Sequence, residues 1–141
     1  MKKTETIFKI ILIFITITLI SCNSIKSKSN QNNENLIIGT WIIEKSVFNK
    51  QVSPVPKGTN LKFTSDKRMK ITLPKFGENY EDINGIGSWE KDGEIVTIEY
   101  DEKKLWGELQ KWKITKLTKK SLEWEMKMGE GLQKEIYNRK N

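Results

Sequence analysis

The residue types that most enzymes rely on are scarce in this chain of 141 residues. It has no histidine and one cysteine, Cys22, so a catalytic triad or a zinc centre would lack its usual groups. Glu78, Glu81 and Asp82 lie close together in sequence, but without a glycine-centred ligand loop they indicate a solvated loop more than a cation site. No paired-acid arrangement supports carboxylate chemistry. We therefore expect no catalytic residues, no metal and no cofactor, and we do not expect an enzyme.

The single cysteine follows a segment with the features of a secretion signal. Residues 1–3 form a basic start and residues 10–20 an apolar run of 11 residues, which is shorter than the ~20 residues of a membrane-spanning helix. The run ends in LISC at residues 19–22, which resembles the bacterial lipobox. The resemblance implies cleavage before Cys22, acylation of its thiol with a fatty acid such as palmitate, and attachment to a membrane through that lipid. The alternative is an ordinary signal peptide with an incidental cysteine.

A polar tether follows the expected lipid anchor. Residues 23–35 are rich in Ser and Asn and contain no aromatic residue, so they cannot bury enough apolar surface to become ordered. Residues 23–28 contain no acid, unlike the acidic cluster that directs some Gram-negative lipoproteins to the cell surface. That comparison implies a protein of the bacterial cell envelope facing the periplasm. We thus expect a signal peptide at 1–21, the lipidated cysteine and tether at 22–35, and one domain at 36–141.

The charges of the chain are mixed in sign. There are 25 Lys and Arg against 18 Asp and Glu, a formal net charge of +7. Basic residues are interleaved with acids and form no block, whereas a nucleic-acid-binding domain usually concentrates them on one face. We expect this charge to serve solubility, with no nucleic-acid partner.

Hydrophobic alternation with a period of two dominates residues 36–141. In the first run, residues 36–48, Trp41, Ile43 and Val47 fall on one largely apolar face, as in a half-buried strand. The same pattern, punctuated by turn signals, predicts eight antiparallel strands at residues 36–48, 61–64, 69–73, 86–91, 94–100, 105–117, 122–128 and 132–139. Residues 49–60 and 74–85 are predicted as polar loops. Evenly spaced short strands joined by hairpins indicate an up-and-down barrel or a sandwich.

Short motifs along these strands occur in a recognisable order. They are GTW at residues 39–41, LKFTSDK at 61–67, GSW at 87–89 and WKI at 112–114. Their order resembles the lipocalin superfamily, in particular the short lipocalin-like domains of bacterial lipoproteins, although Lys67 stands where that family usually has glycine. The resemblance implies an all-β fold, a small eight-stranded antiparallel up-and-down barrel. It also implies a closed end at which a late-strand arginine, Arg139, stacks on Trp41.

Five tryptophans in a small domain raise the question of a ligand. The interior of an eight-stranded barrel holds its own side chains or one small ligand, so most of these rings could simply be core. Trp106 lies near a turn and Gly107 and could sit at a rim. The candidate ligand-binding residues are Trp41, Trp89, Tyr100, Trp112 and Trp124.

Two functions remain open at this point. The favoured one is a membrane-anchored lipoprotein that binds a small hydrophobic or amphipathic ligand in or at the mouth of the barrel. The alternative is a structural or protein-interaction module with a filled barrel, which would use a surface such as residues 54–56 to contact an envelope protein. An open cavity would favour the first and a filled interior the second.

Overall fold

The computed structural model describes residues 36–75 and 77–141, so the predicted signal peptide, Cys22 and the tether lie outside the described residues. The elements are β1 (Gly39–Phe48), β2 (Gln51–Val52), β3 (Asn60–Phe63), β4 (Arg68–Leu73), β5 (Ile83–Asp92), β6 (Ile95–Tyr100), α3 (Lys103–Trp106), β7 (Leu109–Leu117), β8 (Ser121–Met128) and β9 (Gly131–Arg139). No helix in these two ranges combines the length and the apolar character needed to cross a membrane.

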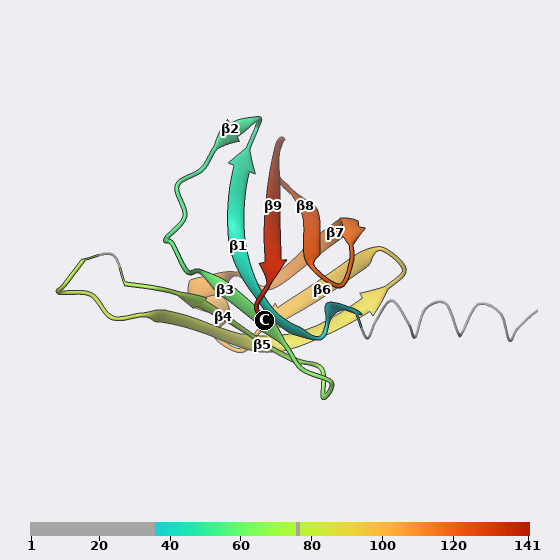
Figure 1. The fold of residues 1–141 in the computed structure, drawn as a ribbon, viewed down its shortest axis with the longest axis horizontal. Coiled ribbons are helices and arrows are strands. Elements are labelled where there is room, and N and C mark those ends of the chain that lie inside the picture. The colour runs from blue at the N-terminus through green and yellow to red at the C-terminus, as the bar shows by residue number, and fades with distance from the viewer. Residues whose placement is uncertain (1–35, 76) are drawn as a thin grey trace, which may run out of the picture. The chain divides into compact units, whose positions relative to one another are not determined.

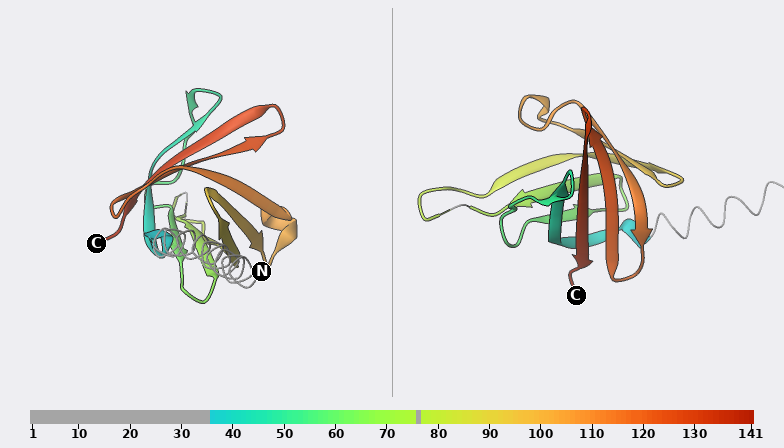
Figure 2. Two further views of the ribbon diagram at one scale, coloured as in Figure 1. Left: turned by 90° about the vertical axis from the view of Figure 1, so that its right-hand side faces the viewer. Right: turned by 90° about the horizontal axis from the view of Figure 1, so that it is seen from above.

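The strands form one closed antiparallel sheet (Figures 1 and 2). Each long strand pairs with the next along the chain, from β1 and β3 through to β9, and β9 returns to pair with β1. At this closure Trp41 lies opposite Arg139 and Ile43 opposite Tyr137. The two-residue strand β2 pairs only with the end of β1, as Figure 1 shows. The predicted eight-stranded up-and-down barrel is therefore confirmed, and its closure leaves no long exposed edge.

The structure differs from the sequence pattern in the strand β2, which lies within the polar loop predicted at residues 49–60, and in the starts of three predicted strands. The first strand begins at Gly39, because Leu36 and Ile37 in front of it are helical and not extended. The strand predicted from residue 86 begins at Ile83, where it pairs with Leu73. The start of the strand predicted at 105–117 is instead the end of the one-turn helix α3.

A β-bulge in β1 changes which side chains point inward. Its register against β9 shifts between Ile43 and Lys45, so one extra residue is inserted and the alternation reverses beyond it. Ser46 is consequently buried, with 3% of its surface exposed. Val47, which the alternation placed on the inner face, is only partly buried and is corrected to the other face.

Aromatic rings pack against one another in the barrel interior. Phe63 packs edge-on against Trp89, with ring centroids 5.5 Å apart, and against Trp124, with centroids 6.1 Å apart. Trp41, Trp89 and Trp124 are all almost completely buried. These three indoles and Phe63 belong to one hydrophobic core cluster.

The turn between β3 and β4 explains the departure from the family pattern at Lys67. Its φ is 64°, in the left-handed region that glycine adopts most easily. The lysine ammonium lies 4.4 Å from the centroid of the Trp89 ring, a cation–π contact that glycine could not make. The contact offsets part of the cost of that backbone conformation.

Candidate ligand-binding cavity

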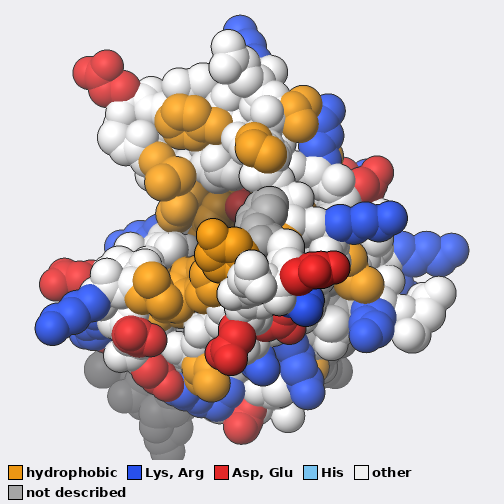
Figure 3. All heavy atoms as spheres, turned by 90° about the vertical axis from the view of Figure 1, so that its left-hand side faces the viewer, with side chains coloured by type: hydrophobic (Ala, Val, Ile, Leu, Met, Phe, Trp, Pro, Cys, Tyr) orange, Lys and Arg blue, Asp and Glu red, His pale blue; other side chains and the backbone are white. Residues whose placement is uncertain are grey.

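A cavity of about 310 Å³ lies inside the barrel. Its wall is built from β3, β4, β6, β7, β8, β9 and the helix α3. The lining residues are Leu61, Ile71, Ile98, Tyr100, Trp106, Gln110, Trp112, Trp124, Met126, Met128, Gln133, Glu135 and Tyr137. Figure 3 shows a hollow bordered by hydrophobic side chains on the face seen from the left-hand side of Figure 1. The volume is at the lower end of the range of small-molecule sites.

Five aromatic rings supply much of the cavity wall. Tyr100 and Trp106 are stacked with centroids 5.1 Å apart and planes 17° apart. Trp112 and Trp124 are stacked at 4.8 Å and 22°, and Tyr137 meets Trp124 edge-on at 5.8 Å. These rings come from five successive elements, so the wall is held in shape by the barrel and not by one flexible loop.

Trp106 reaches the cavity because α3 and Gly85 leave room for it. Gly107, with φ of 84°, ends α3 directly after this residue. A side chain at position 85 would collide with the indole, so the glycine lets the ring lie against β5. The Trp106 indole N–H is the one buried side-chain polar group in the described residues with no hydrogen-bond partner. Trp106, for which the sequence suggested a position at the rim, therefore forms part of the cavity wall.

A hydrogen-bonded cluster centred on Glu135 interrupts the apolar wall. Its Oε2 accepts hydrogen bonds from the Tyr137 hydroxyl at 2.7 Å and from Trp124 Nε1 at 3.1 Å. Its Oε1 accepts only a long bond of 3.5 Å from Gln133 Nε2, which also donates to Ser46 Oγ at 2.6 Å. Glu135 is the one charged side chain among the lining residues, and no lysine or arginine lines the cavity with it.

Burial controls the ionisation of the groups in this cluster. It raises the pKa of Glu135, and the hydrogen bonds from Tyr137, Trp124 and Gln133 offset part of that rise. Burial and the nearby Glu135 carboxylate also raise the pKa of Tyr100 and of Tyr137. Both phenols are therefore neutral at physiological pH, and Tyr137 remains a hydrogen-bond donor to the carboxylate.

The raised pKa of Glu135 predicts a specific pH dependence of stability. Above about pH 4.3 the unfolded chain loses the proton from this residue while the folded protein still holds it, so Glu135 makes stability fall with rising pH until the folded-state pKa is passed. Glu135→Gln should remove this component. The free energy of unfolding of the variant should therefore increase relative to that of the wild type as the pH increases across that window. Urea unfolding at a series of pH values measures it. Glu78→Gln, at an exposed position, is the control, and parallel pH profiles for Glu135→Gln and the wild type would contradict the prediction.

The structure separates the five sequence candidates into two groups. Tyr100, Trp112 and Trp124 line the cavity, but Trp41 and Trp89 do not. Trp41 Nε1 donates to the Ile37 carbonyl at 2.7 Å and Trp89 Nε1 to the Thr64 carbonyl at 3.2 Å. These bonds direct both indoles towards backbone outside the cavity wall. Trp41 and Trp89 therefore belong to the hydrophobic core and not to the wall of this cavity, where the sequence analysis had grouped them with the other candidate rings.

The sequence analysis missed the polar side of the cavity. Gln133 and Glu135 share the alternation of Tyr137 on β9, which is almost completely buried. Counting inward positions back from a tyrosine near the strand end could have found them. Gln110 was missed as well; it accepts a hydrogen bond from Trp112 Nε1 at 3.1 Å and donates one to the Trp106 carbonyl at 3.2 Å.

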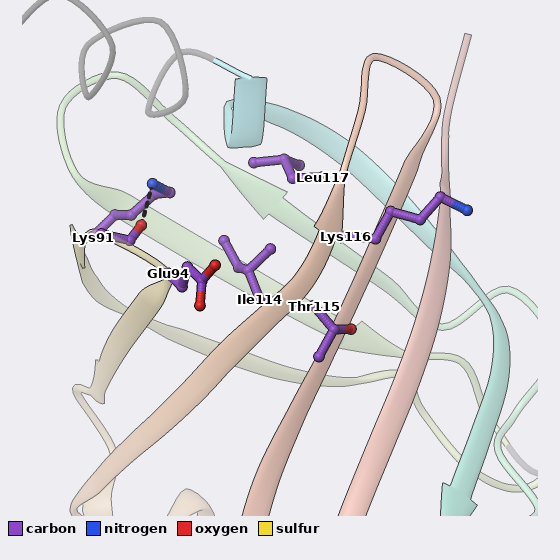
Figure 4. Close-up of a pocket in the computed structure, with 7 residues that line it drawn as sticks. Lys91, Glu94, Ile114, Thr115, Lys116 and Leu117 are labelled. Carbon is purple, nitrogen blue, oxygen red and sulfur yellow. Dashed lines mark hydrogen bonds between the residues drawn. The ribbon is translucent and has the colours of Figure 1, made fainter.

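A smaller hollow of about 180 Å³ lies between the β5–β6 turn and β7 (Figure 4). Lys91, Glu94 and Ile114 border it, and the Lys91 ammonium donates to the Gly93 carbonyl at 2.6 Å. Figure 4 shows Lys116 directed away from Glu94. Because no polar groups converge there, we assign it no ligand.

The acidic loop offers no metal site in the described structure. Across residues 36–75 and 77–141, no group of three or more His, Cys, Asp or Glu side chains is placed to hold a metal ion. Glu78, Glu81 and Asp82 are all exposed. The Asp82 carboxylate instead accepts a hydrogen bond from the Lys75 backbone N–H at 3.0 Å.

Comparison with solved structures defines the class of fold. No protein-family model matches the chain, and no curated protein sequence matches it either. The barrel is a lipocalin-like fold, as the sequence motifs predicted. A lipocalin-like protein from Bacteroides uniformis is similar with a TM-score of 0.58 and 12% identity, over 74% of this chain and 99% of that one. An uncharacterized protein from Bacteroides eggerthii is similar with a TM-score of 0.56 and 11% identity, over 73% and 98% of the two chains.

Proposed function

We propose that this protein is a binding module that holds one small amphipathic ligand inside its barrel. The observation that carries the proposal is the cavity of about 310 Å³ with aromatic walls and one polar cluster. Concave, mostly apolar sites with a few convergent polar groups are the usual form of small-molecule sites. In this cavity the apolar part of a ligand would contact the rings, and its polar part would meet Glu135 and Gln133.

The cavity favours this function over the two alternatives. A structural or protein-interaction module with a filled barrel would leave no such volume. Catalysis by a pair of carboxylates would need a second acid, and Glu135 is the one acidic residue among those lining the cavity. The proposal is therefore binding without chemical change.

We also propose that the module is tethered to a membrane of the bacterial envelope, facing the periplasm. This rests on the sequence LISC at residues 19–22 and the polar residues 23–35. The tether would enter the domain at the closed end, where Trp41 and Arg139 bond to the carbonyls of residues 36–38.

Filling the cavity is expected to abolish binding of an apolar probe. Met126 lines the cavity and is partly buried, so Met126→Trp should place an indole in the ligand space. We expect N-phenyl-1-naphthylamine to bind the wild type with an increase in its fluorescence, and to bind this variant at least about tenfold more weakly, or ~1.4 kcal/mol.

The matched control introduces the same side chain outside the cavity. Ile86 on β5 is 49% exposed, so Ile86→Trp should leave the probe affinity unchanged. Circular dichroism would establish that both variants are folded. Equal probe binding by Met126→Trp and the wild type, or no binding by the wild type, would overturn the proposed function.

A further inference from the structure

We propose that the ligand is a small organic cation, an amine or alkylated ammonium with apolar substituents, whose charge is neutralised by Glu135 and whose substituents contact the aromatic wall. This inference rests on the proposed function and specifies the ligand class of the same cavity. Three properties of the cavity support it: its charge, its rings and its hydrogen-bonding groups.

The charge of the cavity is one-sided. Glu135 is the one charged residue in the wall. The neighbouring Lys134 does not line the cavity, and its ammonium forms a salt bridge with Glu125 at 3.2 Å. Burying a carboxylate without a cationic partner is unfavourable. A cation in the cavity would supply that partner through a charge-assisted contact. An anionic ligand would instead be repelled.

The rings provide the second component of cation recognition. Tyr100, Trp106, Trp112, Trp124 and Tyr137 all line the cavity, and a cation is attracted to the faces of such rings. Aromatic cages of this composition are the usual protein solution for alkylated ammonium groups, which carry charge but have few or no N–H donors. A strongly hydrated inorganic cation would gain little from the same wall.

The hydrogen-bonding groups of the wall also favour a cation. The Trp112 and Trp124 indole N–H groups and the Tyr137 hydroxyl already donate within the wall, as do the amide groups of Gln110 and Gln133. Glu135 Oε1, by contrast, accepts only the 3.5 Å bond from Gln133. Trp106 Nε1 is the one buried donor of the described wall with no partner, whereas the weakly satisfied acceptor, Glu135 Oε1, carries the charge that would attract a cation.

Cation binding should be linked to the protonation of Glu135. The titratable groups that face this carboxyl are Tyr100 and Tyr137, which both stay neutral at physiological pH. Only the ionised carboxylate attracts the ligand charge, and burial raises the pKa of Glu135. We expect the affinity for a permanently charged cation to increase as the pH rises through the folded-state pKa of Glu135, with proton release on binding below that pKa.

The test compares two probes of the same shape and different charge. Choline carries a quaternary ammonium, and 3,3-dimethylbutan-1-ol has a neutral carbon in its place. By isothermal titration calorimetry we expect the folded protein to bind choline at least about tenfold more tightly than the alcohol, or ~1.4 kcal/mol. Equal affinity of the wild type for the two probes, or tighter binding of the alcohol, would be enough to overturn the inference.

Two variants then assign the effect to the cavity. Glu135→Gln should lose the preference for choline, whereas Glu78→Gln, which removes the same charge from an exposed loop position, should keep it. Retention of the preference by Glu135→Gln would overturn the role of this carboxylate.

Two further binding measurements distinguish a failure of the cation inference from a failure of the proposed binding function. Binding to phosphatidylcholine vesicles without binding to free choline would overturn the small-cation assignment in favour of a lipid headgroup. Binding of N-phenyl-1-naphthylamine without a choline preference would overturn the cation inference and leave the proposed binding function standing. If neither probe bound, both proposals would be wrong.

Discussion

Replacing Trp41 by alanine is expected to lower the free energy of unfolding by about 3–5 kcal/mol. The indole is completely buried at the closed end of the barrel, with 0% of its surface exposed. The variant would lose a large apolar side chain, and the Ile37 carbonyl would lose the hydrogen bond that it accepts from Trp41 Nε1. Urea unfolding measures the change. Trp106→Ala, at the partly buried position in α3, is the comparison and should cost less.

Arg139 covers the same indole and joins three backbone carbonyls. Its guanidinium carbon lies 4.2 Å from the centroid of the Trp41 ring. Its Nη1 donates to the Ile38 carbonyl at 2.8 Å, its Nε donates to the Lys119 carbonyl at 2.7 Å, and its Nη2 donates to the Leu36 carbonyl. The arginine thus links the start of the domain to the β7–β8 turn.

This arrangement predicts energetic coupling between Trp41 and Arg139. Arg139→Ala should cost less than Trp41→Ala, and a double-mutant cycle should give a coupling of about 0.5–2 kcal/mol for the stacked pair. Arg68→Ala is the matched control, because Arg68 pairs with Asp101 on the surface and both side chains are about half exposed. Exposed pairs contribute about 0–1 kcal/mol. If the losses of unfolding free energy caused by Trp41→Ala and Arg139→Ala simply added in the double variant, the predicted coupling would be contradicted.

Replacing Cys22 by serine is expected to abolish membrane attachment. Without the thiol there is no site for the acyl chains, and each buried methylene of such a chain contributes about 0.8 kcal/mol to membrane binding. Labelling with a palmitate analogue should disappear, and the protein should move to the soluble fraction or remain as an uncleaved precursor. Ser24→Ala, two residues further on, is the control that should keep both the label and the membrane fraction. Unchanged labelling of Cys22→Ser would show that this cysteine is not lipidated.

The closed end of the barrel was predictable because local sequence and tertiary contact agree there. Gly39 has a φ of 138°, and a side chain at this position would collide with Arg139 Nη1. The glycine of the Gly-x-Trp motif is therefore required by the arginine that covers the tryptophan. The resemblance of the sequence motifs to the lipocalin superfamily implied this arrangement, and the close approach of Arg139 to Gly39 gives its physical reason.

The β-bulge in β1 was not predictable in the same way. Lys45 interrupts the apolar alternation between Ile43 and Val47 in the sequence, but one charged residue in such a series does not by itself distinguish an inserted residue from an exposed inner position. The bulge exists because β1 must pair with β9 in one register before Glu44 and in another after it. That requirement comes from closing the barrel, which no single strand encodes.

The sequence by itself determined the strand order and which rings point inward. Three rings share a strand face with aliphatic neighbours: Tyr100 with Val96 and Ile98, Trp112 with Ile114, and Trp124 with Leu122. All of these side chains are buried. Alternation distinguishes the inside of a barrel from the outside because successive side chains point to opposite faces.

Only the tertiary structure decided which inward side chains fill the core and which line a cavity. Trp41 and Trp112 point inward alike, yet Trp41 is closed over by Arg139 and Trp112 borders open space. Depth along the barrel depends on the stagger of all eight strands and on α3, which brings Trp106 against Gly85. The placement of Glu135 among these rings has the same origin, because a period of two specifies a face of a strand but carries no information about what lies across the barrel from it.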